Sequence, residues 1–112
     1  MIDVAFVHDE ELNFEGLFLR DRDSGETFEV QRSIEFDEQD VAMGMRMDTY
    51  CLVWKGATYY GGIVEWAIDG YAFTVHLSND AGAELGLPPL LAFDLDAAGV
   101  DVVRRQLPAL CA

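Results

Sequence analysis

The stretch "YCLVWKGATYYGGIVEWAIDGYAFTVHLS", residues 50–78, decides the fold that we expect for this chain. Two pairs of turn residues, Lys55-Gly56 and Asp69-Gly70, interrupt runs that are rich in aromatic and β-branched side chains. Runs of this kind joined by short turns are typical of antiparallel hairpins. The stretch therefore predicts three successive strands, at residues 50–54, 59–68 and 71–78.

The first of these strands is apolar on both of its faces. Alternation along a strand sends three side chains to each face, Tyr50, Leu52 and Trp54 to one and Thr49, Cys51 and Val53 to the other. A strand with two apolar faces is typical of the buried centre of a sheet. We therefore expect residues 50–54 to form the middle of the sheet.

Strands are also predicted on the N-terminal side of this stretch. Residues 27–36 alternate between apolar and polar side chains, with Arg32 as an exception on the apolar face. The turn residues Asp23-Ser24-Gly25 come just before, so residues 14–20 and 27–36 are expected to form a hairpin. A further strand is expected at residues 1–7.

After residue 78 the hydrophobic period changes and helices are expected. Asn79 or Asp80 can cap a short helix that ends at Gly86, and residues 90–95 are expected as an edge strand. Asp96 can cap a terminal helix with one apolar stripe, and Pro108 should bend or fray its last turn. The stripe consists of Val100, Val103, Leu107 and Leu110.

These elements are expected to form one α+β domain that spans residues 1–112. A chain of 112 residues that is 51% hydrophobic can bury one core but not two. The predicted fold is mostly an antiparallel β-sheet of about five to seven strands, with one short helix and a C-terminal helix packed on it.

The chain shows no sign of export or membrane insertion. Its first residues have no basic region, and its longest apolar runs are too short to span a bilayer. Cys51 and Cys111 lack the spacing of a disulfide framework and are expected to stay reduced. We therefore expect a soluble, cytoplasmic protein.

The chain is strongly acidic, with 21 acidic and 7 basic side chains and a net charge of −14. Residues 1–48 hold 14 of the acidic side chains and 4 of the basic ones. Such a field repels nucleic acid and anionic lipid, and it attracts basic surfaces through fast, salt-sensitive association. We expect neither nucleic acid nor a membrane as a partner. Excess acid that only keeps the protein soluble is the alternative to a basic protein partner.

No familiar catalytic or metal-binding motif is present, so we expect no enzyme activity, no cofactor and no metal. The carboxylates of Asp94 and Asp96, and those of residues 37–40, are better explained as solvated groups than as a cation site. His76 lies on a polar strand face beside Thr74 and is a candidate general base, but no nucleophile accompanies it.

Three segments together resemble the polymorphic-toxin immunity proteins of the family numbered ten: "VQRSIEFDEQDVAMG", "MDTYCLVWKGATYYGGIVEWAIDG" and "LSNDAGAELGLP". The residues that carry the resemblance are Gln31-Arg32, Gln39-Asp40, Gly44-Met45, Asp48-Thr49-Tyr50, Tyr60-Gly61-Gly62 and Ala83 to Leu87. The similarity covers roughly residues 14–110, and Arg46-Met47 is an insertion relative to the family pattern.

The resemblance implies a bacterial protein that binds a cognate toxin domain and blocks it without catalysis. The acidic charge favours a basic toxin, such as a nuclease, and aromatic anchors would slow dissociation. We expect the contact surface to combine an acidic loop with two aromatic side chains: Asp37, Glu38, Asp40, Asp48, Tyr59 and Tyr60.

Two alternatives come from other classes of protein. A small enzyme could use His76 together with a nearby carboxylate. A structural subunit would form a homo-oligomer with Trp66 or Phe93 at its interface.

Overall fold

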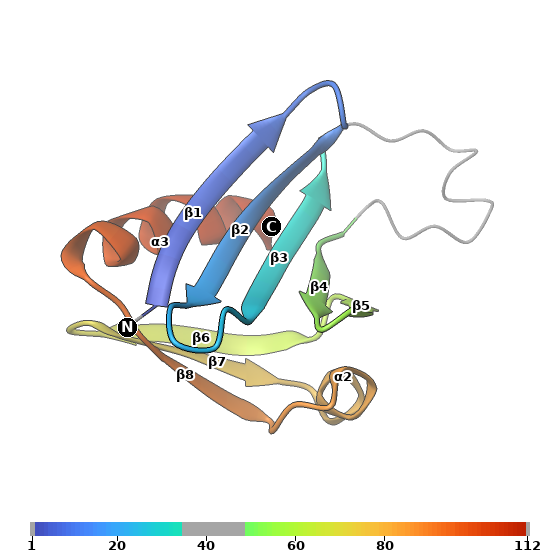
Figure 1. Ribbon diagram of the computed structural model, residues 1–112. Helices are drawn as coiled ribbons and strands as arrows, with labels where there is room; N and C mark the ends of the chain where they lie inside the picture. Colours follow the sequence, from blue (N-terminus) through green and yellow to red (C-terminus); the bar gives the residue numbers. More distant parts are fainter. Residues whose placement is uncertain (1, 35–48, 112) are drawn as a thin grey trace.

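The computed structural model describes residues 2–34 and 49–111, which form two antiparallel sheets and two helices (Figure 1). Sheet A contains β1 (Ile2–Asp9), β2 (Phe14–Asp21), β3 (Thr27–Ser33), β4 (Cys51–Trp54) and β5 (Ala57–Tyr60), in that order. Sheet B contains β6 (Ile63–Asp69), β7 (Ala72–Leu77) and β8 (Leu90–Asp94). The helices are α2 (Asn79–Leu85) and α3 (Ala97–Leu110).

The α+β class, the antiparallel pairing, the short helix and the C-terminal helix are confirmed. The predicted edge strand at residues 90–95 is β8, which lies at one edge of sheet B. The described residues form eight strands, and the sequence did not indicate that they divide into two sheets.

The prediction that residues 50–54 form the middle of the sheet is wrong. β4 is the fourth of the five strands of sheet A, and β3 occupies the middle. Only the Leu52 face of β4 points into the core, where Leu52 has no exposed surface. Cys51 and Val53 are half-buried on the other face. These two side chains are apolar, but no second layer of described elements covers them.

The predicted strand at residues 59–68 is also divided, because the chain turns at Gly61-Gly62. Both glycines have positive φ angles, +76° and +99°, which side chains other than glycine rarely adopt. β5 ends just before this pair and β6 begins just after it, in the other sheet. The glycine pair therefore passes the chain from sheet A to sheet B.

Gly62 also allows α2 to approach the chain closely. A Cβ atom at Gly62 would lie 2.6 Å from the Cβ atom of Ala81 in α2. The backbone N–H of Ser78 donates a hydrogen bond to the carbonyl of Gly62 (2.8 Å). The hydroxyl of Ser78 accepts the N–H of Ala81 (3.2 Å), so Ser78 caps α2 in place of the predicted Asn79 or Asp80.

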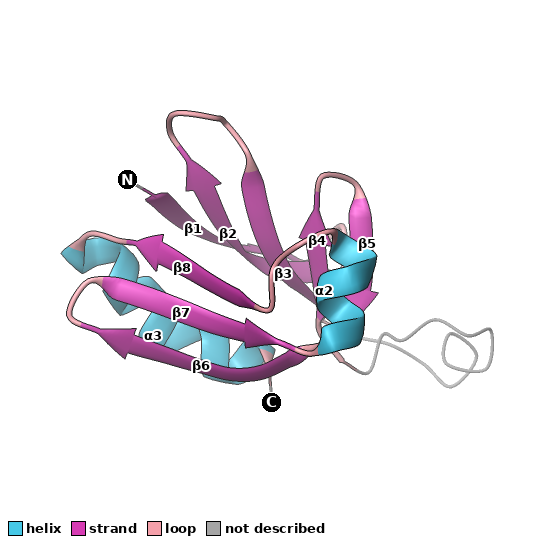
Figure 2. Cartoon of the chain, turned by 90° about the horizontal axis from the view of Figure 1, so that it is seen from below, coloured by secondary structure: helices cyan, strands magenta, loops and turns pink. Residues whose placement is uncertain are grey.

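One core lies between sheet A, sheet B and α3. Figures 1 and 2 show α3 and sheet B on the same side of sheet A. A row of aromatic rings connects the sheets, because Phe93 lies 5.8 Å from Phe28 of sheet A and 5.8 Å from Phe73 of its own sheet. Sixteen described side chains are buried, among them the predicted stripe of α3: Val100, Val103, Leu107 and Leu110.

Both ends of α3 are held by side-chain hydrogen bonds. The carboxylate of Asp96 accepts the N–H of Gly99 (2.7 Å), as predicted for an N-cap. Arg32, the exception on the apolar face of β3, donates to the carbonyls of Ala109 and Leu110 (3.3 Å each). The helix continues through Pro108 to Leu110. Within the described ranges, no helix has the length and apolarity that a membrane span requires.

Candidate functional site

The acidic residues of the predicted contact surface fall outside the described part of the chain. These residues are Asp37, Glu38, Asp40 and Asp48. Their part in binding therefore stays a prediction from the sequence.

The two tyrosines of the predicted surface point to opposite faces of sheet A. Tyr59 points inward and packs against the core, where its ring would lie about 3.0 Å from a Cβ atom at Gly62. Tyr60 points outward, pairs across the strands with Cys51, and is 43% exposed. A single flat partner can contact Tyr60 but not both rings.

Tyr60 belongs to the outer face of sheet A, the face that points away from α3 and sheet B. Val4, on the opposite face, packs next to Gly99 of α3, which fixes the direction of every side chain in the sheet. The outer face carries Asp3, Ala5, Val7, Asp9, Phe14, Gly16, Phe18, Arg20, Thr27, Glu29, Gln31, Ser33, Cys51, Val53, Thr58 and Tyr60. None of the other described elements covers this face in Figures 1 and 2.

Glu29 and Gln31 lie at the centre of the outer face, on the middle strand of sheet A. Glu29 pairs across the sheet with Phe18 on β2 and with Val53 on β4. Gln31 pairs with Gly16 and Cys51 in the next row. The sequence placed both residues on a polar strand face, but the strand register was needed to show their apolar neighbours.

The carboxylate of Glu29 is partly removed from water. Burial raises its pKa above the ordinary range, and a hydrogen bond from the side chain of Gln31 offsets part of that effect. No Lys, Arg or His of the described ranges forms an ion pair with it. Glu29 is therefore a half-buried carboxylate without an ion-pair partner in this part of the chain, although Arg20 lies on the same face.

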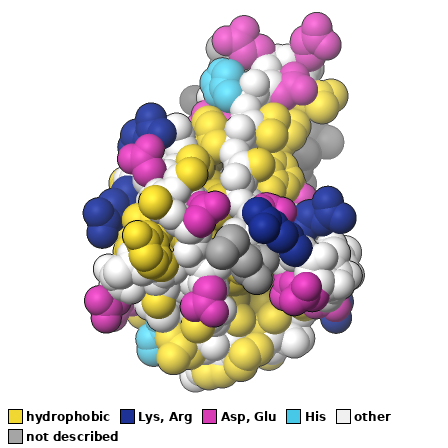
Figure 3. Space-filling view, turned by 60° about the vertical axis from the view of Figure 1, so that its left-hand side comes forward, with side chains coloured by type: hydrophobic (Ala, Val, Ile, Leu, Met, Phe, Trp, Pro, Cys, Tyr) yellow, Lys and Arg dark blue, Asp and Glu magenta, His cyan; other side chains and the backbone are white. Residues whose placement is uncertain are grey.

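Figure 3 looks at the molecule with the β1 side turned forward. Hydrophobic side chains gather in the upper half of the visible face, and acidic side chains crowd the upper tip. This tip is the turn between β1 and β2, which carries Asp9, Glu10 and Glu11. The upper half of this view is thus apolar with an acidic tip, and basic and acidic side chains are mixed across the middle.

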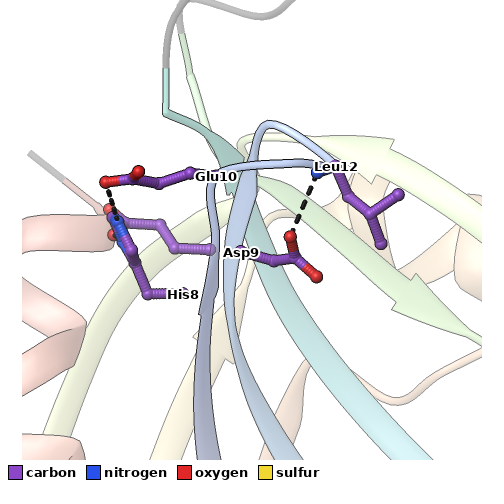
Figure 4. A network of polar contacts seen from close by, with 5 residues as sticks. His8, Asp9, Glu10 and Leu12 are labelled. Atoms are coloured by element: carbon purple, nitrogen blue, oxygen red, sulfur yellow. Dashed lines mark hydrogen bonds and ion pairs between the residues drawn. The ribbon is translucent and has the colours of Figure 1, made fainter.

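A histidine lies beside that acidic turn, on the inner side of β1 (Figure 4). The Nδ1 atom of His8 is 3.0 Å from a carboxylate oxygen of Glu15, and its Nε2 atom is 3.7 Å from one of Glu10. The hydrogen bond to Glu15 is the main cause that raises the pKa of His8. In the turn itself, the carboxylate of Asp9 accepts the N–H of Leu12 (3.1 Å). These contacts fix a turn and offer no nucleophile.

His76, the candidate general base, lies on the exposed face of sheet B. It lines a small hollow with Glu65, Thr74 and Leu90, and Glu65 is its partner across the strands. Within the described residues His76 makes no hydrogen bond or ion pair. Glu65 is therefore a carboxylate near His76, but no hydrogen bond joins the two side chains.

The residues suggested for an oligomer interface are half-buried and pack against the core. The ring of Trp66 packs edge-on against Phe73 (6.2 Å between centroids), and Phe93 packs between two other phenylalanines. Their part in an interface between copies stays a prediction. In the described ranges, no group of three or more His, Cys, Asp or Glu side chains is placed to hold a metal ion.

Comparison with protein families decides which class of protein this fold and surface belong to. The model of one family, described as immunity protein 10, matches residues 2–103. The chain belongs to the immunity protein 10 family. No curated protein and no solved structure matches the chain.

Membership of the immunity protein 10 family confirms the resemblance seen in the sequence. It gives the protein a general role in neutralising a toxin. The matched residues include sheets A and B, α2 and the first half of α3, so the family pattern extends over the whole outer face.

Proposed function

We propose that this immunity protein 10 family member binds a toxin domain encoded beside it, one to one, and blocks that domain without catalysis. The observation that carries the proposal is the family match, which covers residues 2–103. The fold supports it, because the described residues show an extended sheet face and no assembled acid–base pair.

The toxin domain that we infer is basic, and a nuclease is one such domain. A net charge of −14 attracts a basic surface over long distances and raises the rate of association, which salt then lowers. A nuclease carries basic residues for its own substrate. The same residues can be used by an acidic inhibitor.

The contact surface that we propose includes Tyr60 and the acidic residues Asp37, Glu38, Asp40 and Asp48. Tyr60 pairs with Cys51 at the start of β4, and Gln31 pairs with Cys51 from β3. Tyr60 therefore lies at the end of sheet A where residues 34 and 49 bound the acidic segment. Aromatic side chains of this kind are enriched at the centres of protein interfaces.

Calorimetric titration against the toxin domain encoded beside this protein tests the proposal, at low and at high salt. We expect tight one-to-one binding that weakens with salt. Tight binding that is insensitive to salt would retain the immunity role but remove the electrostatic part. Absence of binding would contradict the proposed function for that toxin.

A second experiment tests the acidic segment separately. Replacing Asp37, Glu38 and Asp40 with lysine should slow association at low salt and change dissociation little, because long-range attraction acts before contact. The control carries three lysines elsewhere, at Asp69, Glu84 and Asp94, and has the same net charge. Equal association rates for the two folded variants would exclude a local role for the segment.

A further inference from the structure

The outer face of sheet A carries a carboxylate where most sheets would carry a neutral side chain. Glu29 lies on the central strand and pairs across the sheet with Phe18 on β2 and with Val53 on β4. The ring of Phe18 leans over Gly16, where a Cβ atom would be 3.1 Å from the ring. Glu29 thus has an apolar residue as its partner on each neighbouring strand.

A partly desolvated carboxylate is energetically unfavourable on a surface that contacts only water. Its neighbours across the strands remove part of its hydration, and a hydrogen bond from Gln31 offsets part of that effect. Arg20 lies on the same face, but it forms no ion pair with Glu29. A cation that arrives with a partner can form an ion pair in this partly desolvated setting. Such pairs strengthen as water is excluded.

We propose that Glu29 is the centre of the toxin contact and that it receives an arginine side chain of the toxin domain. The inference rests on the proposed function and specifies which face binds and by which chemistry. It adds Glu29 to the contact surface proposed above, which consists of Tyr60, Asp37, Glu38, Asp40 and Asp48.

Arginine fits this place better than lysine for two physical reasons. A planar guanidinium can bind a carboxylate with two parallel hydrogen bonds and can stack on an aromatic ring such as that of Phe18. It is also more weakly hydrated than an ammonium group, so moving it against an apolar face costs less. The net charge of −14 favours a basic partner in general, whereas Glu29 selects the point of contact.

The test compares two glutamates that differ only in their location. Glu65 lies on the exposed face of sheet B, opposite His76, and it likewise forms no ion pair within the described residues. Variants Glu29→Gln, Glu29→Lys, Glu65→Gln and Glu65→Lys are titrated against the toxin domain encoded beside this protein. Each Glu29 variant has a Glu65 counterpart with the same net charge, so a long-range effect is equal in the pair.

We expect Glu29→Lys to weaken binding at least about 30-fold, mainly through faster dissociation, since breaking a contact between desolvated charges acts on the bound state. Glu29→Gln should weaken it less, about 10-fold, because the amide retains the shape. Both Glu65 variants should change affinity less than about 3-fold. Equal effects at Glu29 and Glu65 in folded variants would overturn the inference. If the unaltered protein fails to bind, the proposed function fails instead.

A compensation experiment tests the choice of arginine. Toxin-domain variants that regain binding to Glu29→Lys are selected from a random library. We expect replacements of an arginine by Asp or Glu among them, because the charges of the pair are then exchanged. Recovery only through changes at other residue types would contradict the arginine assignment.

Discussion

The ionised side chain of Glu29 would favour binding of the proposed partner but lowers the stability of the free protein. Burial raises the pKa of its carboxyl, which means that the folded state binds the proton more tightly than the unfolded chain does. The contribution of Glu29 to stability therefore falls as the pH rises from the ordinary pKa of glutamate through the raised value. At neutral pH the ionised carboxylate destabilises the free protein.

Replacing Glu29 with glutamine should accordingly stabilise the free protein near neutral pH. The gain should be up to about 0.5 kcal/mol, the range expected for a surface substitution, because the group is only partly buried. The gain should disappear at about pH 3, below the ordinary pKa of glutamate, where the carboxyl is protonated in both states. Arg20 and Cys51 are the nearest other ionisable groups on this face, and both remain in the variant. Urea denaturation at the two pH values measures the difference; a loss of stability near neutral pH would contradict the argument.

Gly62 offers a second prediction at the level of one residue. Gly62→Ala combines a positive φ angle with a Cβ atom 2.6 Å from that of Ala81, so we expect a loss of about 2–5 kcal/mol. Gly61→Ala is the matched control, because Gly61 also has a positive φ angle but open space around its Cβ position. That variant should lose about 1–2 kcal/mol. Chemical denaturation of both gives the comparison, and equal losses would show that the contact with α2 contributes nothing.

Among the elements, α3 depends on a side chain from a distant strand. The C-terminal carbonyls of a helix carry partial negative charge and lack partners within the helix. Arg32 supplies donors to two of them, at Ala109 and Leu110. The next residue, Cys111, is half-buried, and burial raises the pKa of its thiol to about 11.

Arg32→Met should therefore loosen the last turn of α3. We expect a loss of about 1.5–3 kcal/mol in unfolding free energy and faster modification of Cys111 by a thiol reagent, measured with Cys51 replaced by serine. Because Arg32 also lowers the pKa of the Cys111 thiol, the rates are compared per ionised thiol, from their dependence on pH. The control is Arg105→Met, which removes an exposed pair with Asp101 and should cost less than about 0.5 kcal/mol. Unchanged thiol reactivity in Arg32→Met would show that the helix end is held by packing alone.

Period-two patterns and turn residues predicted most strands, because a strand's alternation and a turn's chemistry both depend on residues that are neighbours in the sequence. The division between β5 and β6 was missed, since a glycine pair inside an apolar run is compatible with a bulge as well as with a change of sheet. Arg32 stood out as an exception, but its partner lies 77 residues away, and no local pattern encodes that distance.

At the scale of the molecule, the net charge of −14 should oppose folding through self-repulsion. Salt screens exposed charges beyond about 10 Å at 0.1 M. We therefore expect the Tm to rise by a few degrees as sodium chloride is raised from about 10 mM to about 300 mM, in scanning calorimetry. A falling Tm would mean that favourable ion pairs, such as that of Arg22 with Asp3, outweigh the repulsion.

The candidate site could be predicted only in part, because residue type can be read from the sequence but neighbours on other strands cannot. Composition revealed the acidic character, and residue type indicated Tyr60 as a contact. Strand alternation sends Tyr59 and Tyr60 to opposite faces, but the sequence could not show which of these faces is covered. It also could not show that Glu29 has Phe18 and Val53 as its partners, because they come from β2 and β4.

The order of the strands has a consequence for the rate of folding. In both sheets every strand pairs with the strand before or after it in the chain, and no strand has to wait for a distant partner. Folds built from such local pairings reach the native state sooner than folds with long crossovers. The first three strands of sheet A can thus pair as successive hairpins, and β4 and β5 join them after residues 34–50. In a cell that also makes the toxin, an immunity protein that folds early shortens the time during which the toxin is active without its inhibitor.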